Sequence, residues 1–230
     1  MKSRIIAITG VTSIGKTEVA FEIAKRLGAN VICGDKVQII AGYPRITGAV
    51  DHEQFAIGSF LYGSSKLRMD RATWRNLVKG ITSAVGGEFV IDGLAWLYMR
   101  QALDVGAIIF RLNPDMSKLR KYIEMRLDRE IQNGLLDEVR RGERDLNLIK
   151  ESCTAEFLSK HTRGEQSLED AKNLLIEYSM KRADIKVNDS NTFSQNFIEV
   201  DHDVFNKEKT VEYIMRRLHD SVIFTPSREG

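Results

Sequence analysis

One short motif near the start of the chain limits what this sequence can fold into. Residues 10–17 read Gly-Val-Thr-Ser-Ile-Gly-Lys-Thr, which fits the pattern G-x-x-x-x-G-K-S/T of a phosphate-binding loop. An apolar run at residues 5–8 precedes the loop, and apolar residues at helical spacing follow it over residues 19–27. The loop therefore joins a buried strand to a helix, an arrangement that points backbone N–H groups at a bound phosphate.

Apolar runs and helical segments alternate through most of the chain. Further strands are predicted at residues 31–33, 89–91, 107–110 and 197–200, and helices near residues 70–84, 115–141 and 204–219. Helical crossovers between short apolar strands indicate an α/β fold, a P-loop NTPase-like parallel sheet flanked by helices, with a C-terminal helical insertion or lid. The expected parts are a core at 1–143, a helical lid or substrate segment at 144–190, and a return strand and helix at 191–230.

Composition limits the class of protein and its partners. The 230 residues include 34 basic and 32 acidic side chains, a net charge of +2, which gives no electrostatic footprint for bulk nucleic-acid binding. Two cysteines form neither a disulfide framework nor a zinc pattern and fit a reducing compartment. We find no targeting segment and no apolar stretch of membrane-spanning length. We therefore expect a cytoplasmic monomer without a membrane partner.

The residue types in and near the loop indicate phosphate chemistry. Lys16 is placed to reach terminal phosphate oxygens, and the Thr17 hydroxyl to join the shell of a Mg²⁺ ion. Asp35 follows the second predicted strand, so it faces the same crevice, because ligands of open α/β sheets lie at the carboxyl ends of strands. A carboxylate there accepts a proton from a reacting group, or it orients Lys16 or metal-bound water. Both interpretations stay open on these residues alone.

A second block of residues carries a resemblance to a known family. Gly34-Asp35-Lys36-Val37-Gln38, with the loop and its Thr12, resembles the opening of the isopentenyltransferase family, which moves a dimethylallyl group onto N6 of adenine. Arg126-Leu127-Asp128 and the segment 133–140 resemble a helix further along the chains of that family. The likeness covers residues 4–142 and is thin beyond them.

Two departures from the family pattern stand near the loop. Val11 replaces a proline, and Asp92-Gly93-Leu94-Ala95 stands where relatives keep a G-G-T/S turn. Asp92 is either a Walker-B-like carboxylate that holds a metal-bound water or a cap of the following helix. Both interpretations of Asp92 stay open.

The resemblance implies that the loop holds the diphosphate of dimethylallyl diphosphate, the leaving group. The expected diphosphate-binding residues are Gly10, Val11, Thr12, Ser13, Ile14, Gly15, Lys16, Thr17, Arg126, Lys181 and Arg182. Catalytic roles are implied for Thr12, Arg126 and Asp35. Of these, Asp35 is the one expected to accept a proton from the adenine N6 amine. The remaining expected roles are nucleotide binding by Asp35, Lys36, Gln38 and Thr47, a prenyl pocket at Tyr178, and a metal site at Thr17 for Mg²⁺, the expected cofactor.

The resemblance also bears on the acceptor. Family members that act on tRNA are longer and carry an extra helical domain, for which this chain lacks room. We therefore expect AMP and dimethylallyl diphosphate as substrates, a cytokinin nucleotide precursor as product, and no nucleic-acid partner. Tyr178 matches a tyrosine of the family, and short bacterial relatives place a histidine three residues after that tyrosine. Here Lys181 occupies the position of the histidine. Lys181 is either a second cation for the diphosphate or a solvated lysine.

Two other functions compete with prenyl transfer. A small-molecule kinase would hold ATP in the same loop and use Asp35 to activate an acceptor hydroxyl. Such a kinase carries an arginine-rich lid, for which Lys181-Arg182 is a poor substitute. A non-catalytic P-loop binding protein is the other alternative, because the turn at Asp92-Gly93-Leu94-Ala95 departs from the family pattern.

Overall fold

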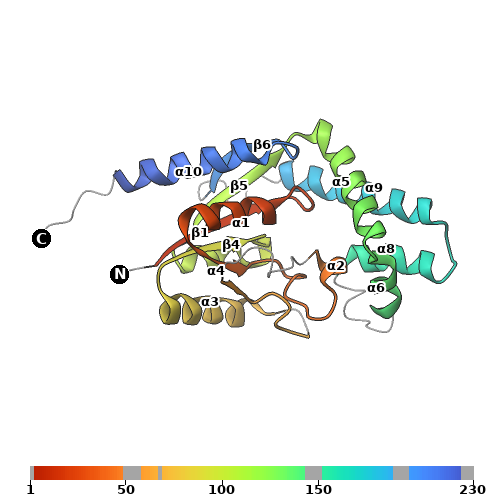
Figure 1. Ribbon diagram of the computed structural model, residues 1–230, viewed down its shortest axis with the longest axis horizontal. Coiled ribbons are helices and arrows are strands. Elements are labelled where there is room, and N and C mark those ends of the chain that lie inside the picture. The colour runs from red at the N-terminus through yellow and green to blue at the C-terminus, as the bar shows by residue number, and fades with distance from the viewer. Residues whose placement is uncertain (1–2, 49–57, 67–68, 143–151, 189–196, 224–230) are drawn as a thin grey trace, which may run out of the picture.

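The structure, a computed structural model, describes residues 3–48, 58–66, 69–142, 152–188 and 197–223 (Figure 1). Six strands of these residues form one sheet: β1 (Arg4–Gly10), β2 (Asn30–Cys33), β3 (Ser59–Phe60), β4 (Glu88–Asp92), β5 (Ile108–Pro114) and β6 (Phe197–His202). Their order across the sheet is β3-β2-β4-β1-β5-β6, and every neighbouring pair is parallel. The predicted parallel α/β fold is confirmed. The edge strand β3 was not predicted.

Helices cover both faces of the sheet. The helices are α1 (Lys16–Leu27), α2 (Pro44–Thr47), α3 (Arg71–Val85), the 3₁₀ helix η2 (Trp96–Tyr98), α4 (Met99–Asp104), α5 (Met116–Gln132), α6 (Leu135–Gly142), α8 (Cys153–Thr162), α9 (Leu168–Asn188) and α10 (Lys207–Ile223). The helical pattern predicted at residues 115–141 is a pair, α5 and α6. None of the helices in the described residues is long and apolar enough to cross a membrane.

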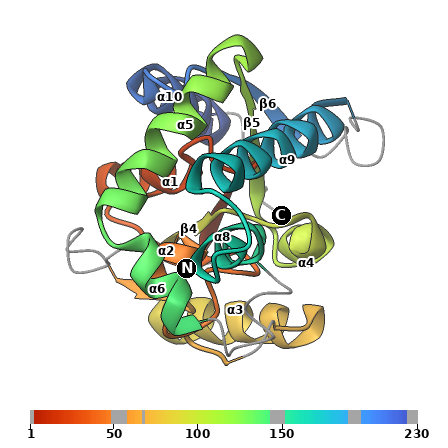
Figure 2. The same ribbon diagram turned by 90° about the vertical axis from the view of Figure 1, so that its right-hand side faces the viewer.

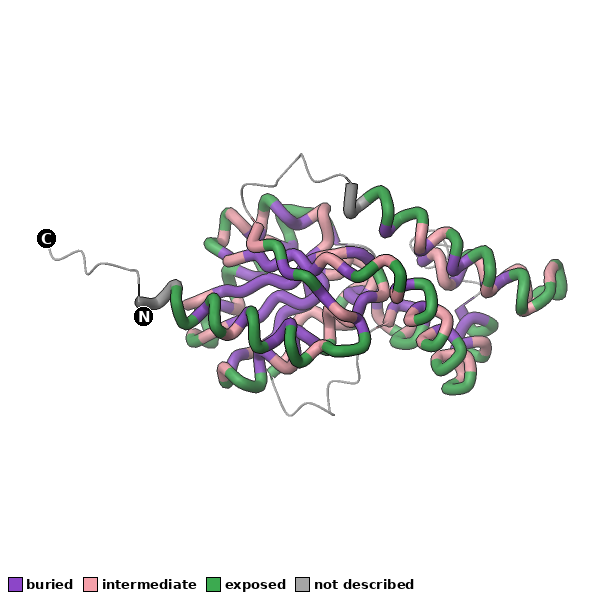
Figure 3. The backbone as a smooth tube through the Cα atoms, turned by 90° about the horizontal axis from the view of Figure 1, so that it is seen from above, coloured by how far each residue is buried: buried purple, intermediate pink, exposed green. Residues whose placement is uncertain are grey.

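Alternating residues of β1 pack into two different apolar clusters. Ile6 and Ile8 join a cluster that includes side chains of α1, α5 and α10, whereas Ile5 and Ala7 join one that includes side chains of α3 and α4. This two-residue period is that of a strand buried on both faces. Figure 3 shows the strands buried at the centre and exposed residues on the outer sides of the helices.

Helices α5, α6, α8 and α9 lie beyond the carboxyl ends of the strands (Figures 1 and 2). Glu138 of α6 connects this group to α2, since its Oε1 accepts the Ile46 N–H at 2.8 Å. Burial raises the pKa of Glu138. Ser152, the N-cap of α8, donates to the Ile46 carbonyl at 3.4 Å. The helices thus form a wall that faces the end of the sheet where the phosphate-binding loop lies.

Strand β6 ends against the phosphate-binding loop through His202. This histidine is 2% exposed, and its Nε2 lies 2.7 Å from the Ile14 carbonyl oxygen of the loop. Because a carbonyl oxygen only accepts, Nε2 carries the proton, and Nδ1 accepts from the Thr210 hydroxyl at 2.8 Å. Burial lowers the pKa of His202, and the hydrogen bond to the Ile14 carbonyl and the charge of Asp203 oppose this in part.

The free energy of unfolding is expected to depend on pH through His202. Its folded pKa lies below the ordinary value of 6.5, so its stabilising contribution is fully present above that pH and is lost as the pH falls through the folded pKa. A His202→Gln variant lacks this contribution and should lose less stability between about pH 7 and about pH 5. Urea unfolding of both proteins at both pH values measures this; an equal loss in both would contradict the prediction.

Candidate active site

The phosphate-binding loop lies between β1 and α1 at the carboxyl edge of the sheet. Gly10 has a φ of +144°, and a Cβ there would lie 2.7 Å from the Leu112 carbonyl oxygen, so glycine is required. Gly15 is the N-cap of α1 and offers no side-chain cap, which leaves the first N–H groups of the helix to an anion. Lys16 Nζ donates to the Val11 carbonyl at 2.6 Å. Burial lowers the pKa of Lys16, whereas the negative charge of Asp35 raises it by a smaller amount.

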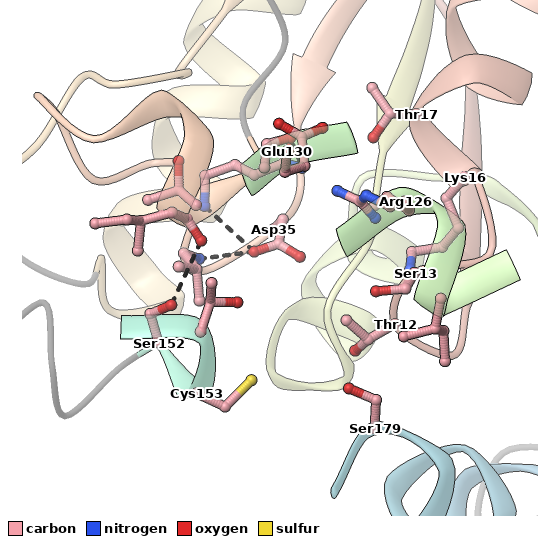
Figure 4. Close-up of a pocket in the computed structure, with 18 of the residues that line it drawn as sticks. Thr12, Ser13, Lys16, Thr17, Asp35, Arg126, Glu130, Ser152, Cys153 and Ser179 are labelled. Atoms are coloured by element: carbon pink, nitrogen blue, oxygen red, sulfur yellow. Dashed lines mark hydrogen bonds between the residues drawn. The ribbon is translucent and has the colours of Figure 1, made fainter. Parts of the chain in front are cut away.

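Asp35 lies across the cavity from the loop (Figure 4). It follows Gly34, where a Cβ would lie 2.7 Å from Ile91 Cγ2, so the ends of β2 and β4 approach closely. Asp35 Oδ1 accepts the N–H groups of Val37 at 2.7 Å and Gln38 at 3.3 Å. Neither bond uses Oδ2, which is therefore the oxygen available to a ligand.

A second carboxyl group, Asp92, ends β4 next to the loop. Its side chain is fully buried, Oδ2 accepts from the Tyr62 hydroxyl at 2.7 Å, and Oδ1 has no hydrogen-bond partner among the described residues. Burial raises the pKa of Asp92 to about 6. Hydrogen bonds from the hydroxyls of Tyr62 and Thr17 lower the pKa and so oppose this effect in part. The interpretation of Asp92 as a helix cap is wrong, because Ala95 and Tyr98 hold the N-cap positions of η2 and α4.

A cavity of about 1250 Å³ joins the loop, Asp35 and the helical wall. The predicted site residues that line it are Gly10, Thr12, Ser13, Gly15, Lys16, Thr17, Asp35, Lys36, Gln38, Thr47, Arg126, Tyr178 and Arg182. Val11 and Ile14 do not line it, since their side chains are buried in the apolar core and leave only backbone groups for a phosphate. Lys181 is exposed and does not line the cavity. Arg182 does line it, because it lies four residues after Tyr178 and so shares the face of α9 that Tyr178 presents to the cavity.

Two of the predicted nucleotide-binding side chains are already hydrogen bonded to the backbone around α2. Gln38 Nε2 donates to the Gly48 carbonyl at 2.8 Å, and its buried Oε1 has no partner among the described residues. The Thr47 hydroxyl donates to the Tyr43 carbonyl at 2.8 Å, which leaves its oxygen lone pairs as acceptors. The Gln38 oxygen is therefore an acceptor that still needs a donor.

Helix α5 presents a polar face to the cavity. Figure 4 shows the Arg126 guanidinium pointing into the space between Asp35 and Lys16. Arg126 also reaches the turn after α2, because a Cβ on Gly48 would lie 2.9 Å from its Nη2. Glu130 and Asn133 line the same cavity. Neither was predicted as a site residue, although their spacing of four and seven residues from Arg126 is a helical signal that indicates a shared face.

An apolar patch lines the cavity on the side of the helical wall. Its side chains are Ile123 and Leu127 of α5, Leu135 of α6, and Leu175 and Tyr178 of α9. The Tyr178 ring contacts Phe157 at a centroid distance of 5.5 Å, and its hydroxyl accepts from Arg182 Nη1 at 3.1 Å. Such a patch suits a short hydrocarbon group bound next to polar residues.

The start of α8 adds cavity-lining residues for which no site role was predicted. They are Ser152, Cys153, Thr154 and Glu156. A serine before a helical segment indicates an N-cap, and Ser152 does cap α8, but that signal says nothing about a cavity.

The comparisons with known proteins agree with the resemblance found in the sequence. Residues 3–57 match the model of the family described as Isopentenyl transferase, which confirms the resemblance over that segment. An adenylate isopentenyltransferase 5 of Arabidopsis thaliana is 28% identical over 61% of this chain and 47% of its own length. A tRNA dimethylallyltransferase of Staphylococcus carnosus is 38% identical over 23% of this chain and 17% of its own length. The chain thus matches less than half the length of these curated relatives.

A solved structure shows the same fold. The full-length tRNA isopentenylpyrophosphate transferase of Bacillus halodurans superposes with a TM-score of 0.78, covering 94% of this chain and 96% of that chain at 16% sequence identity. At this identity the likeness concerns the fold alone, and it confirms the P-loop NTPase-like sheet flanked by helices.

The expectation of no nucleic-acid partner is contradicted by these relatives, several of which are named for tRNA. Chain length is no ground for excluding such a partner, because the match covers 96% of the solved chain of the Bacillus halodurans transferase. Net charge does not exclude it either, because a sum over the whole chain hides local clusters. Basic side chains that line the cavity are Lys16, Lys36, Arg45, Arg126, Arg129 and Arg182.

Proposed function

We propose that this protein transfers the dimethylallyl group of dimethylallyl diphosphate to the N6 amine of an adenine. The observation that carries the proposal is the cavity, in which the carboxylate of Asp35 faces a phosphate-binding loop across a space that also has an apolar patch. These three parts answer the three needs of the reaction: a base, a holder for the leaving diphosphate and a pocket for the prenyl group.

The loop and two cations serve the leaving group. As the allylic C–O bond breaks, its electron pair goes to the diphosphate, whose negative charge grows. The free N–H groups at the start of α1, Lys16 and the fork of Arg126 stabilise that charge where it develops. Thr12 lines the cavity within the loop, and its hydroxyl donates to a diphosphate oxygen.

Asp35 and Gln38 serve the acceptor. The N6 nitrogen forms a bond to the allylic carbon, becomes acidic as it does so, and releases a proton to Asp35 Oδ2. The backbone N–H groups of Val37 and Gln38 hold Oδ1 and so orient the carboxylate. The remaining N6 hydrogen supplies the donor that the buried Gln38 Oε1 needs.

The residues present fit a Mg²⁺ ion. Magnesium prefers oxygen ligands. The Thr17 hydroxyl lines the cavity, and next to it lies the buried Asp92 Oδ1, which has no hydrogen-bond partner among the described residues. Bound there, Mg²⁺ supplies positive charge next to the departing diphosphate.

For the acceptor we propose AMP, with an adenine within an RNA as the second candidate. AMP is favoured by the adenylate isopentenyltransferase relative, which matches 61% of this chain. RNA is favoured by the relatives named for tRNA and by Arg45 and Arg129, which are exposed side chains at the cavity and suit a phosphodiester backbone.

Product analysis by mass spectrometry tests this proposal. The protein is incubated with Mg²⁺, dimethylallyl diphosphate and either AMP, ADP, ATP or an RNA stem-loop with an unpaired adenine. Dimethylallyl-AMP is the expected product, and prenylated RNA without prenylated AMP would select the second acceptor. Phosphate transfer from ATP without prenyl transfer would overturn the proposal in favour of a kinase. Ligand binding without any turnover would favour a binding protein.

Arg182→Ala is expected to raise the KM for dimethylallyl diphosphate by about tenfold, the usual effect of losing one hydrogen bond to a charged group. Lys181→Ala is expected to change it less, because Arg182 lines the cavity and Lys181 does not. Initial rates at varied donor concentration measure both variants. A larger effect of Lys181→Ala would contradict the assignment of Arg182 to the donor side.

A further inference from the structure

Two segments that lie 188 positions apart in the sequence meet behind the phosphate-binding loop. Strand β6 ends at His202, whose side chain is buried and donates from Nε2 to the Ile14 carbonyl oxygen at 2.7 Å. The Thr210 hydroxyl of α10 lies 2.8 Å from Nδ1 and holds the ring from its other side. His202 does not line the cavity, whereas Gly15, the residue that follows Ile14, does. The hydrogen bond from His202 therefore reaches the loop from outside the candidate site.

The contact at Ile14 determines the direction of the next N–H group of the loop. The peptide bond between Ile14 and Gly15 is trans and planar, so its carbonyl oxygen and its N–H point in opposite directions. Because the oxygen is turned toward His202, the Gly15 N–H points away from His202. Gly15 lines the cavity, as do Lys16 and Thr17 after it. The Gly15 N–H is thus directed to the place of a bound phosphate, as an anion site built from backbone N–H groups requires.

The loop needs support from outside because its own backbone is strained. Ser13 has a φ of +65°, in the left-handed region that residues other than glycine seldom adopt. A residue persists in that region where the surrounding structure fixes its conformation. Ile14, the next residue, has a fully buried side chain, and its carbonyl is bonded to His202. These two contacts fix the chain directly after the strained residue.

A second residue of the same C-terminal segment packs on the loop. Lys207, the first residue of α10, lies so close to Gly15 that a Cβ there would lie 2.6 Å from Lys207 Cε. The ammonium group of Lys207 pairs with Glu18 in the first turn of α1. Like His202, Lys207 does not line the cavity. The return strand and helix therefore support two successive loop residues, Ile14 and Gly15.

We propose that His202 is a positioning residue of the diphosphate site, because through the Ile14 carbonyl it holds the Gly15 N–H in the direction of the leaving group. Thr210 contributes by donating to Nδ1, which keeps the proton of the neutral ring on Nε2. The inference rests on the proposed function in that it places a diphosphate in the loop. It gives β6 and α10 a part in diphosphate binding, although none of the described residues 197–223 lines the cavity.

Titration calorimetry with inorganic diphosphate on two polar, uncharged variants tests this role. Gln places its amide N–H close to the position of the histidine Nε2, whereas Asn is too short to reach the Ile14 carbonyl. His202→Gln should therefore bind diphosphate within about threefold of the wild type, and His202→Asn about tenfold more weakly, the usual loss of one hydrogen bond to a charged group. His219→Asn is the matched control, because His219 is an exposed histidine of α10 and its replacement should leave the affinity unchanged.

A role of His202 in stability alone would lower the melting temperature of both variants and leave their diphosphate affinities equal. Equal affinities of folded His202→Gln and His202→Asn would therefore overturn the proposal. Should His202→Asn fail to fold, as judged by circular dichroism, nuclear magnetic resonance of the wild-type protein decides. The signal of the isotope-labelled Gly15 amide should move downfield when inorganic diphosphate is added, and an unchanged signal would reject the direction assigned to that N–H.

The same data separate this inference from the proposed function. Diphosphate affinity that differs between His202→Gln and His202→Asn in a protein without prenyl transfer would reject the function and keep the positioning role. Prenyl transfer together with equal diphosphate affinities of the two variants would reject the positioning role alone.

Discussion

The Asp35→Asn variant is expected to transfer the dimethylallyl group about 10² to 10⁴ times more slowly than the wild-type protein, the usual contribution of a positioned general base. An amide oxygen is too weak a base to take the N6 proton. Asn keeps an oxygen that can accept the N–H groups of Val37 and Gln38, so the local backbone should not change. The loss should therefore appear in kcat rather than in stability or in donor binding.

Diphosphate affinity is the control measurement for the Asp35→Asn variant. Titration calorimetry with inorganic diphosphate should give similar affinities for Asp35→Asn and wild type, because Asp35 lies across the cavity from the loop. Turnover is measured as prenylated product under saturating substrates. A kcat within about tenfold of the wild-type value would rule out Asp35 as the base.

Lys16→Ala is expected to lower kcat by about 10² to 10³ and to weaken diphosphate binding as well. In the structure Lys16 Nζ donates to the Val11 carbonyl of its own loop, so it is held at the place where a phosphate would bind. Lys25→Ala is the matched control, since Lys25 is an exposed lysine of the same helix α1. The measurements are product formation, and calorimetry with inorganic diphosphate and, separately, with ATP.

A Lys16→Ala variant that retains both turnover and diphosphate affinity would contradict the use of the loop as holder of the leaving group. A variant that loses affinity for ATP but not for diphosphate would instead support the kinase interpretation. The two outcomes are distinguishable because calorimetry is run with each ligand separately.

Local sequence signals predicted the sheet and the loop side of the site. Strands β1, β2, β4, β5 and β6 contain short apolar runs, and the loop residues and Asp35 sit next to strand ends, where chain direction alone places them at one edge. The two-residue strand β3 carries too short a pattern to be recognised.

The helical side of the site could not be predicted in the same way. Ser152 reaches the cavity because it contacts Ile46, a residue 106 positions earlier, and no local pattern reports such a contact. The alternatives for Asp92 had a similar cause: its hydrogen bond to Tyr62 joins residues 30 positions apart and became visible only in the fold. Lys181 and Arg182 are adjacent in sequence, and only the orientation of α9 shows which one lines the cavity.

The proposed reaction is tested most directly by quantifying both of its products in one mixture of the wild-type protein, Mg²⁺, dimethylallyl diphosphate and an adenine acceptor. Inorganic diphosphate and the N6-dimethylallyl product should appear in equal amounts, because one C–O bond breaks for each C–N bond formed. Diphosphate release without a prenylated adenine, or a prenyl group on an atom other than N6, would contradict the proposed reaction.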